Sequence, residues 1–316
     1  MTRVAAIDCG TNSIRLLIAD VAPGAPLVDV ERTMTVVRLG EGVDRTGEFA
    51  PDALARTFAA ADAYAAACAA ASVERVRFVA TSATRDARNR DVFMEGITAR
   101  LGVAPEVISG DEEARLSFAG AVSVMGELGA LPGPYLVVDL GGGSTELVVG
   151  TDAPAHAFSM DVGCVRMTER HLHLDPPTPA QVAAAEADVR AALDAAARVV
   201  PLGAVRTVIG VAGTVTTVTA HALGLPAYSR EAIHGSRVSL DQVIARCAEL
   251  TAMPRAQRAA LPFMHPGRVD VIGAGALVWR EVLERVRSEV RAGGGDIERV
   301  ITSEHDILDG IALSLV

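Results

Sequence analysis

VAAIDCGTNSIRLLI, residues 4–18, has a counterpart later in the chain in LVVDLGGGSTELVV, residues 136–149. Asp8 aligns with Asp139, and the glycine and serine that follow keep the same offset in both stretches. Each stretch is an apolar run, a short polar turn and a second apolar run, which is typical of a β-hairpin. Two such hairpins in register predict two related domains in one chain.

The turns of both hairpins have the composition of an anion-binding loop. Glycine lets the backbone approach a ligand closely, and successive N–H groups in a tight turn form a concave site for phosphate oxygens. Asp8 and Asp139 end the first strands, where a carboxylate can hold a divalent cation. A plain glycine hairpin explains one copy as well, but two copies favour a phosphate site. The expected phosphate-binding residues are Thr11, Asn12, Ser13, Gly141, Gly142, Gly143, Ser144 and Thr145.

A third segment, ISGDEEARL at residues 108–116, places three acids at the start of a predicted helix. Acids in a first turn stabilise the helix dipole by about 0.3–1 kcal/mol each, and for the segment alone this is the simpler explanation. The functional alternative is a carboxylate that deprotonates a water molecule for attack on phosphorus. Its like-charged neighbours would raise its pKa toward a useful range.

Two further segments offer groups for an anion. ATSATRDARNR, residues 80–90, follows a predicted strand and places Arg85 near the strand end, where ligands of α/β proteins usually bind. Arg88 and Arg90 suit a solvated helix face equally well. GVAGTVTT, residues 210–217, runs from a strand through Gly213 and Thr214 into a helix, whose N-terminus can bind phosphate. Glycine at such a turn often serves only close packing, so this segment is the weaker of the two.

The composition excludes several functions. The chain has 316 residues, enough for about two domains, a net charge of −10, and no lysine among its 29 basic residues. A P-loop lysine and Schiff-base chemistry are therefore excluded, and the net charge argues against a general binder of DNA, RNA or membrane surfaces. Four scattered cysteines, no apolar run of membrane length and no leader-like N-terminus predict a cytoplasmic protein with reduced thiols.

Strands and helices alternate along the chain, which predicts an α/β fold with mixed sheets. The expected helices span 52–71, 111–128, 179–200, 240–251, 267–291 and 304–315. The expected strands span 3–9, 14–20, 28–39, 76–81, 104–108, 135–139, 145–150, 156–162, 206–211 and 299–302.

Five segments resemble the motifs of the exopolyphosphatase / guanosine-pentaphosphate phosphatase (Ppx/GppA) family. In order along the chain they are IDCGTNSIRLL, ATSATRDARN, ISGDEEARL, DLGGGSTELV and GVAGTVTT. That family is part of the acetate-and-sugar-kinase, chaperone and actin superfamily. The resemblance runs over essentially the whole chain. It implies two ribonuclease-H-like (actin-like) domains with the active-site cleft between them, the first formed by residues 1–122 plus 303–316 and the second by residues 123–302.

The resemblance also implies residue roles. Glu113 would be the general base, and Arg85 would contact a phosphate. Asp139 and Glu146 would support Mg²⁺ or Mn²⁺, alongside Asp8, which its place at a strand end also suggests.

The implied activity is release of terminal orthophosphate from inorganic polyphosphate. Hydrolysis of guanosine pentaphosphate to the tetraphosphate is an alternative within the same chemistry. A phosphotransferase or ATPase, and a non-catalytic sensor of polyphosphate or alarmone, are alternatives from other classes. Longer family members carry further C-terminal helical domains, so for this sequence we expect short polyphosphate chains as the substrate. A homodimer is expected from the resemblance alone.

Overall fold

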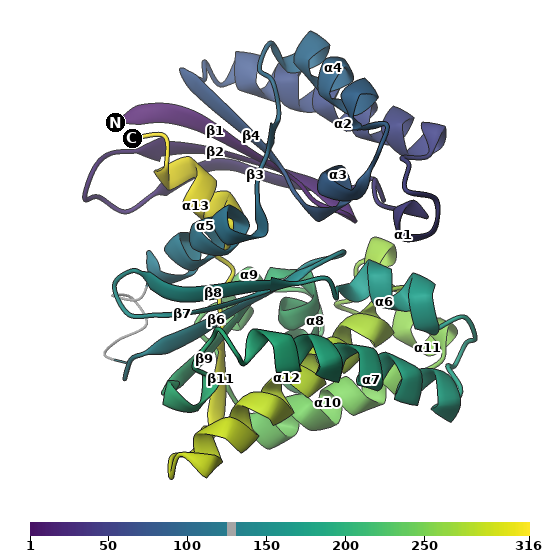
Figure 1. Ribbon diagram of the computed structural model, residues 1–316. Coiled ribbons are helices and arrows are strands. Elements are labelled where there is room, and N and C mark those ends of the chain that lie inside the picture. Colours follow the sequence, from purple (N-terminus) through teal and green to yellow (C-terminus); the bar gives the residue numbers. More distant parts are fainter. Residues whose placement is uncertain (125–130) are drawn as a thin grey trace. The chain divides into compact units, whose positions relative to one another are not determined.

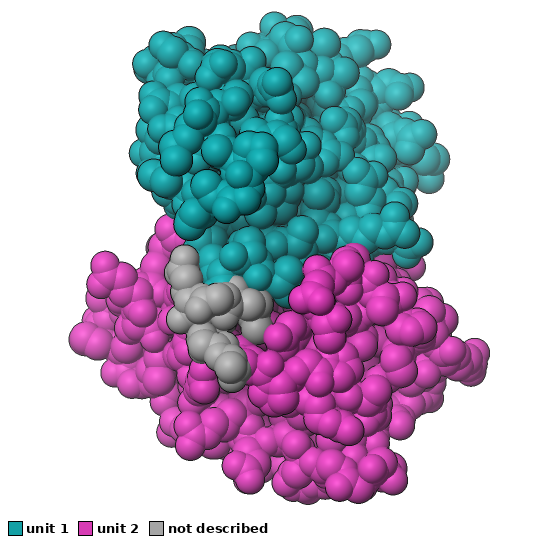
Figure 2. All heavy atoms as spheres, turned by 90° about the vertical axis from the view of Figure 1, so that its left-hand side faces the viewer, with its two compact units in different colours: residues 1–124, 305–316 teal, residues 125–304 magenta. Residues whose placement is uncertain are grey.

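The computed structural model describes residues 1–124 and 131–316. The chain divides into two compact units, which Figure 2 colours separately. Unit 1 comprises Met1–Val124 and His305–Val316, and unit 2 comprises Met125–Glu304. Each unit has its own sheet.

Unit 1 contains a five-stranded mixed sheet with the order β3-β2-β1-β4-β5. Its strands are β1 (Thr2–Cys9), β2 (Ser13–Val21), β3 (Val28–Val36), β4 (Arg75–Ala80) and β5 (Glu106–Val107). β1, β2 and β3 form an antiparallel meander, whereas β4 and β5 run parallel to β1. The first motif therefore forms the predicted hairpin, with its turn between β1 and β2.

Helices cover both faces of this sheet (Figure 1). They are α1 (Val43–Thr46), α2 (Pro51–Ala70), α3 (Ser82–Asp86), α4 (Arg90–Leu101), α5 (Gly110–Val122) and α13 (Ile307–Leu313). Ala5 and Ile7 pack into one core with residues of α2 and α4, whereas Val4 and Ala6 pack into a second core with residues of α5 and α13. This division follows from the alternation of side chains along a strand.

Unit 2 contains a six-stranded mixed sheet with the order β10-β11-β9-β6-β7-β8. Its strands are β6 (Tyr135–Leu140), β7 (Thr145–Gly150), β8 (Pro154–Met160), β9 (Thr207–Val211), β10 (Arg237–Ser239) and β11 (Arg299–Thr302). β6, β7 and β8 form an antiparallel meander, and β9 and β11 run parallel to β6. The topology of unit 1 is thus repeated, as the duplicated hairpin motif predicts.

The largest core of unit 2 is built around the long helix α12 (Ile272–Ala292), which contacts α6, α7, α8 and α10. Trp279 of α12 is fully buried there. The remaining helices are α6 (Cys164–His171), α7 (Pro179–Ala196), α8 (Ala212–Ala222), α9 (Arg230–Ile233), α10 (Leu240–Ala252) and α11 (Arg255–Ala259), with 3₁₀ turns η1 (Leu202–Ala204) and η2 (Pro266–Arg268).

The predicted α/β class with mixed sheets is confirmed, and the differences are shifted element ends and several short elements that were not expected. The last helix begins at Ile307 rather than 304, because Asp306 caps it and forms a capping box with Asp309. The helix expected at 267–291 begins at Ile272, after η2. The helix expected at 111–128 ends at Val122, and positions 125–128 lie outside the described residues. Helix α4 was not expected, and Gly96 near its middle weakens its helical pattern.

All four cysteines are free and buried, as their scattered spacing predicts. Throughout residues 1–124 and 131–316, no helix combines the length and the apolar character that crossing a membrane requires.

Candidate active site

The predicted site residues of unit 1 meet at one edge of its sheet. β1, β4 and β5 are parallel neighbours, so their carboxyl ends lie at the same edge. The turn after β1 contains Thr11 and Asn12, α3 after β4 contains Arg85, and α5 after β5 contains Glu113. Ligands of open α/β sheets bind at such an edge.

In the loop between β1 and β2, the backbone carbonyl groups accept hydrogen bonds, whereas two backbone N–H groups have no acceptor among residues 1–124 and 131–316. Gly10 N–H donates to the Ser13 carbonyl at 3.0 Å, the Thr11 carbonyl accepts from Gly40 N–H at 2.8 Å, and the Asn12 carbonyl accepts from Arg38 N–H at 2.8 Å. Within the described residues, the backbone N–H groups of Thr11 and Asn12 donate to no partner. Open successive donors are what a phosphate-binding turn requires.

The side chains of this loop are used unequally. The Thr11 hydroxyl lies 2.9 Å from the Ser82 hydroxyl at the start of α3, so it is held inside unit 1. The side chains of Asn12 and Ser13 are partly exposed and form no hydrogen bond within the described part of the chain. Gly40 keeps this arrangement possible, because a Cβ at that position would overlap the Thr11 side chain.

Asp8, at the end of β1, lies in a buried ion-pair network. Arg15 Nε donates to Asp8 Oδ2 at 2.9 Å, and Arg15 Nη1 donates to Asp306 Oδ2 at the start of α13. Burial raises the pKa of the Asp8 carboxyl, and the Arg15 guanidinium offsets part of that rise. The arginine thus already neutralises the strand-end carboxylate that the sequence proposed as a metal ligand.

Glu113 is a buried carboxylate in the first turn of α5, with 8% of its surface exposed. Arg85 Nη1 donates to Glu113 Oε2 at 2.7 Å and to the Ile108 carbonyl at 3.0 Å. Burial raises the pKa of Glu113 to about 7, and the nearby Asp8 charge adds to the rise. Arg85 and a hydrogen bond from Thr81 stabilise the ionised carboxylate and so lower the pKa in part. A carboxyl group with this pKa can accept a proton near neutral pH.

Its neighbour in the sequence has a different environment. The Glu112 side chain is 45% exposed and pairs with Arg77 at 2.6 Å. Of the acids in this first turn, Glu113 is the one that the fold buries against an arginine. Burial therefore distinguishes Glu113, the candidate base, from Glu112, which is an acid at a helix start.

The hairpin loop of unit 2 repeats this design. Gly141 N–H donates to the Ser144 carbonyl at 3.0 Å, as Gly10 does to Ser13. The Gly142 carbonyl accepts from two N–H groups at the start of α6, the nearer of them Val165 N–H at 2.8 Å. No partner among residues 1–124 and 131–316 accepts from the backbone N–H groups of Gly142, Gly143 or Ser144.

Thr145 is fully buried, and its hydroxyl donates to the Val162 carbonyl at 2.6 Å. It therefore braces the loop internally. Gly163 is needed at the same place, because a Cβ there would overlap the Gly142 backbone. The donors of this loop that remain open within the described residues are backbone N–H groups and the Ser144 hydroxyl.

Asp139 and Glu146 are the carboxylates of the second hairpin. They are directly opposed across the β6–β7 ladder, and both are buried. Directly opposed residues place their side chains on the same face. Ser159 donates to Glu146 Oε1 at 2.7 Å. At the equivalent ladder position of unit 1, Asp8 faces Arg15 instead of a second acid.

This carboxylate pair fits a divalent cation only in part. Among the described residues, no group of three or more His, Cys, Asp and Glu side chains could hold a metal ion. Mg²⁺, however, is usually held by one or two carboxylates together with waters and substrate phosphates. Asp139 and Glu146 satisfy that protein share.

The GVAGTVTT segment forms the turn from β9 into α8. Ala212, the first residue of α8, has φ = 69°, a left-handed conformation that is strained for alanine. The Thr214 hydroxyl is buried beside Cys164 and Gly275, so it faces the core. Ala212 and Gly213 are the partly exposed residues at this helix start.

Arg268, from η2, lies against Gly213, where a Cβ would meet its guanidinium. Its Nη1 also donates to the Thr217 hydroxyl at 3.1 Å. Arg268, Arg15 and Ser82 are three further residues at the site that are not among the site residues predicted from the sequence. Arg15 and Ser82 lie within the quoted motifs IDCGTNSIRLL and ATSATRDARN, whereas Arg268 lies outside every quoted motif and reaches Gly213 through the fold.

The structure therefore assembles the predicted residues into two groups. Unit 1 brings together Thr11, Asn12, Ser13, Asp8, Arg85 and Glu113. Unit 2 brings together the Gly141–Thr145 loop, Asp139 and Glu146, with Gly213 and Thr214 in the first turn of α8, which follows the neighbouring strand β9. Thr11, Thr145 and Thr214 use their hydroxyls within the fold, so backbone N–H groups and the side chains of Asn12, Ser13 and Ser144 remain for a ligand.

Comparison with known proteins agrees with the family resemblance of the sequence motifs. Residues 17–303 match the model of the Ppx/GppA phosphatase family. The chain is 54% identical over 323 aligned positions to Exopolyphosphatase 2 of Mycobacterium tuberculosis, covering 100% of this chain and 99% of that protein.

Two solved structures extend this likeness to three dimensions. A crystal structure described as an exopolyphosphatase-like protein is 50% identical, with a TM-score of 0.95 over 99% of this chain and 98% of that one. The Aquifex aeolicus PPX-GPPA enzyme is 28% identical, with a TM-score of 0.79 over 99% of each chain. The chain belongs to the Ppx/GppA phosphatase family.

Proposed function

We propose that this protein is an exopolyphosphatase, a phosphoanhydride hydrolase that releases terminal orthophosphate from inorganic polyphosphate. The full-length similarity to Exopolyphosphatase 2 supports the reaction class and the substrate. The observation that carries the mechanism is Glu113, buried, paired with Arg85 at 2.7 Å and with a pKa of about 7.

In the proposed reaction, Glu113 accepts a proton from a water molecule as that water attacks the terminal phosphorus. The bond from this phosphorus to the bridging oxygen breaks, and its electron pair stays with the shortened chain. Phosphoryl transfer needs charge neutralisation and alignment of the attacking group more than covalent protein chemistry. The open N–H groups of the two hairpin loops and the Arg85 guanidinium supply donors of this kind.

Mg²⁺ or Mn²⁺ fits the proposal as a cofactor held by Asp139 and Glu146. When bound, such an ion would neutralise charge on the phosphate oxygens. Asp8 would join the ligand set only if its pair with Arg15 opened. We therefore assign Asp8 first to the electrostatics of Glu113, whose pKa it raises.

The test is orthophosphate release from short polyphosphate, long polyphosphate and guanosine pentaphosphate, with Mg²⁺ or Mn²⁺. Glu113→Gln should lower the rate by about 100-fold or more, as expected for loss of a general base. Glu112→Gln is the matched control, because it makes the same change on the neighbouring exposed acid, and it should retain near-full activity.

Each outcome of this test has a distinct meaning. Faster release from polyphosphate than from guanosine pentaphosphate supports the proposed substrate, and the reverse preference would favour the alarmone phosphohydrolase. Equal losses in the two variants would remove Glu113 as the base. Binding of polyphosphate by a folded protein that releases no orthophosphate would instead favour the sensor function.

A further inference from the structure

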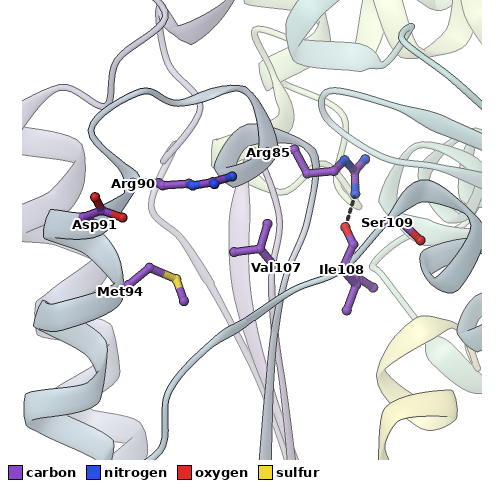
Figure 3. A pocket seen from close by; sticks show the side chains of 7 residues that line it. All are labelled: Arg85, Arg90, Asp91, Met94, Val107, Ile108 and Ser109. Atoms are coloured by element: carbon purple, nitrogen blue, oxygen red, sulfur yellow. Dashed lines mark hydrogen bonds between the residues drawn. The ribbon is translucent and has the colours of Figure 1, made fainter.

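A pocket of about 550 Å³ lies in unit 1 beside the Arg85–Glu113 pair and outside the hairpin loop. Figure 3 shows Arg90, at the start of α4, extending toward the side where Arg85 lies, and Arg85 turning toward Ile108. The lining residues are Arg85, Arg90, Asp91, Met94, Val107, Ile108 and Ser109. Because all belong to unit 1, the pocket needs no contribution from unit 2.

The donors of Arg85 are only partly used. Both hydrogen bonds formed by this side chain, to Glu113 and to the Ile108 carbonyl, come from Nη1. Within residues 1–124 and 131–316, its Nε and Nη2 donate to no partner. A guanidinium has five N–H donors in a fixed plane, so Arg85 can hold Glu113 and a second anion at once.

Arg90 is the second cation of the pocket. It is exposed, and its side chain forms no hydrogen bond or ion pair anywhere in the described part of the chain. Asp91 is the only acid lining the pocket, and it forms no ion pair with Arg90. Arg85 already pairs with Glu113, so Arg90 is the pocket's cation that pairs with no carboxylate of residues 1–124 and 131–316.

The rest of the lining suits a small oxyanion. The Ser109 hydroxyl accepts from Glu112 N–H at 3.2 Å, which leaves its own proton for a ligand. Met94 and Val107 are apolar and add no competing charge. Arginine binds phosphate through charge-assisted hydrogen bonds that are often bidentate.

We propose that this pocket is a second phosphate subsite, formed by Arg85 and Arg90, which rests on the proposed hydrolysis of polyphosphate. Arg85 lines this pocket and also pairs with Glu113. An anion bound in the pocket would therefore be separated from the proposed base by the Arg85 side chain. Two sources supply the same chemistry: the orthophosphate just released, or a phosphate further along the bound chain.

Methyl NMR with ¹³C-methyl methionine and inorganic phosphate alone tests binding without turnover. Met94 lines the pocket, and its resonance is assigned by its loss in Met94→Leu. Phosphate should shift this resonance saturably in the wild-type chain, and Arg90→Gln should weaken the apparent affinity by about fivefold or more, as expected for loss of a charge-assisted hydrogen bond. Arg198→Gln is the matched control, because Arg198 is exposed, also unpaired within the described residues and outside the pocket.

Kinetics of the same variants separate the two sources. If released orthophosphate occupies the pocket, Arg90→Gln raises the inhibition constant of phosphate and leaves KM unchanged for short and long polyphosphate. If the chain occupies it, Arg90→Gln raises KM for long polyphosphate more than for triphosphate. A Met94 resonance that does not respond to phosphate, or responds equally in Arg90→Gln, overturns the subsite. An inactive wild-type chain would contradict the proposed function while leaving the NMR result readable.

Discussion

At the residue scale, the properties of Glu113 depend on one arginine. Arg85 stabilises the ionised carboxylate through a 2.7 Å ion pair, and burial opposes it. The local sequence shows an acid at a helix start, but it does not show which of three acids is buried. The pairing with Arg85 joins residues 28 positions apart.

This balance predicts the pH dependence. In the wild-type chain the base must be ionised, so kcat/KM should rise with pH through an acid limb near the Glu113 pKa of about 7. Arg85→Gln removes the cation that favours the ionised form, so the pKa should rise and the limb should move to higher pH. Profiles of kcat/KM against pH, measured at saturating metal, give the pH midpoint of the acid limb independently of the maximal rate.

Arg88→Gln is the control for that shift. Arg88 is 69% exposed and pairs with Glu48 and the Thr46 carbonyl rather than with Glu113. Its substitution should leave the limb in place. An unmoved limb in Arg85→Gln would mean that Glu113 is not the titrating group.

Ala212 gives a second prediction at this scale. Its φ of 69° is strained for alanine but ordinary for glycine. Ala212→Gly should therefore raise the free energy of unfolding by about 1 kcal/mol, whereas Ala220→Gly, in the interior of the same helix, should lower it by about as much. Urea unfolding of both variants checks the opposite signs, and destabilisation by both would contradict the strain at Ala212.

At the element scale, the crossing of α5 and α13 positions Glu113. α5 begins with the acids and ends against α13, which also packs on β1 and β2. The two helices approach so closely that a Cβ on Gly120 would overlap the Asp306 carbonyl, and one on Gly310 would overlap the Leu116 carbonyl. The hydrophobic pattern of the last helix predicts a docking face, and Ile307, Leu308 and Ile311 are buried as expected.

Gly120→Ala should destabilise the chain by about 1–3 kcal/mol, because the added methyl group meets rigid backbone. Gly96→Ala in α4 is the matched comparison. Its methyl group meets the end of the Phe58 ring, a side chain that can move, and alanine also favours the helix. Thermal unfolding should therefore show a larger loss of Tm for Gly120→Ala, and the reverse order would contradict the backbone contact.

At the scale of the whole molecule, the duplicated hairpin predicts two units with one topology. The five-stranded and six-stranded sheets share an antiparallel meander followed by parallel strands. The two copies differ where Asp8 faces Arg15 and Asp139 faces Glu146. The first hairpin thus places an arginine opposite its aspartate, and the second places a glutamate there.

The homodimer stays a prediction. It comes from the family resemblance, and we expect light scattering to give twice the mass of a single chain across a range of protein concentrations. A single-chain mass at every concentration would remove it.

The sequence by itself determined the two phosphate-type turns, the exclusion of lysine chemistry and the acids at the start of α5. These features depend on hydrogen bonds and conformations within a few residues, so spacing and residue type are enough to predict them. Only the tertiary structure decided that Glu113 rather than Glu112 is buried, that Arg15 bridges Asp8 and Asp306, and that Arg268 lies on Gly213. Those outcomes depend on burial and on pairing between distant segments, and both arise from packing of the folded chain.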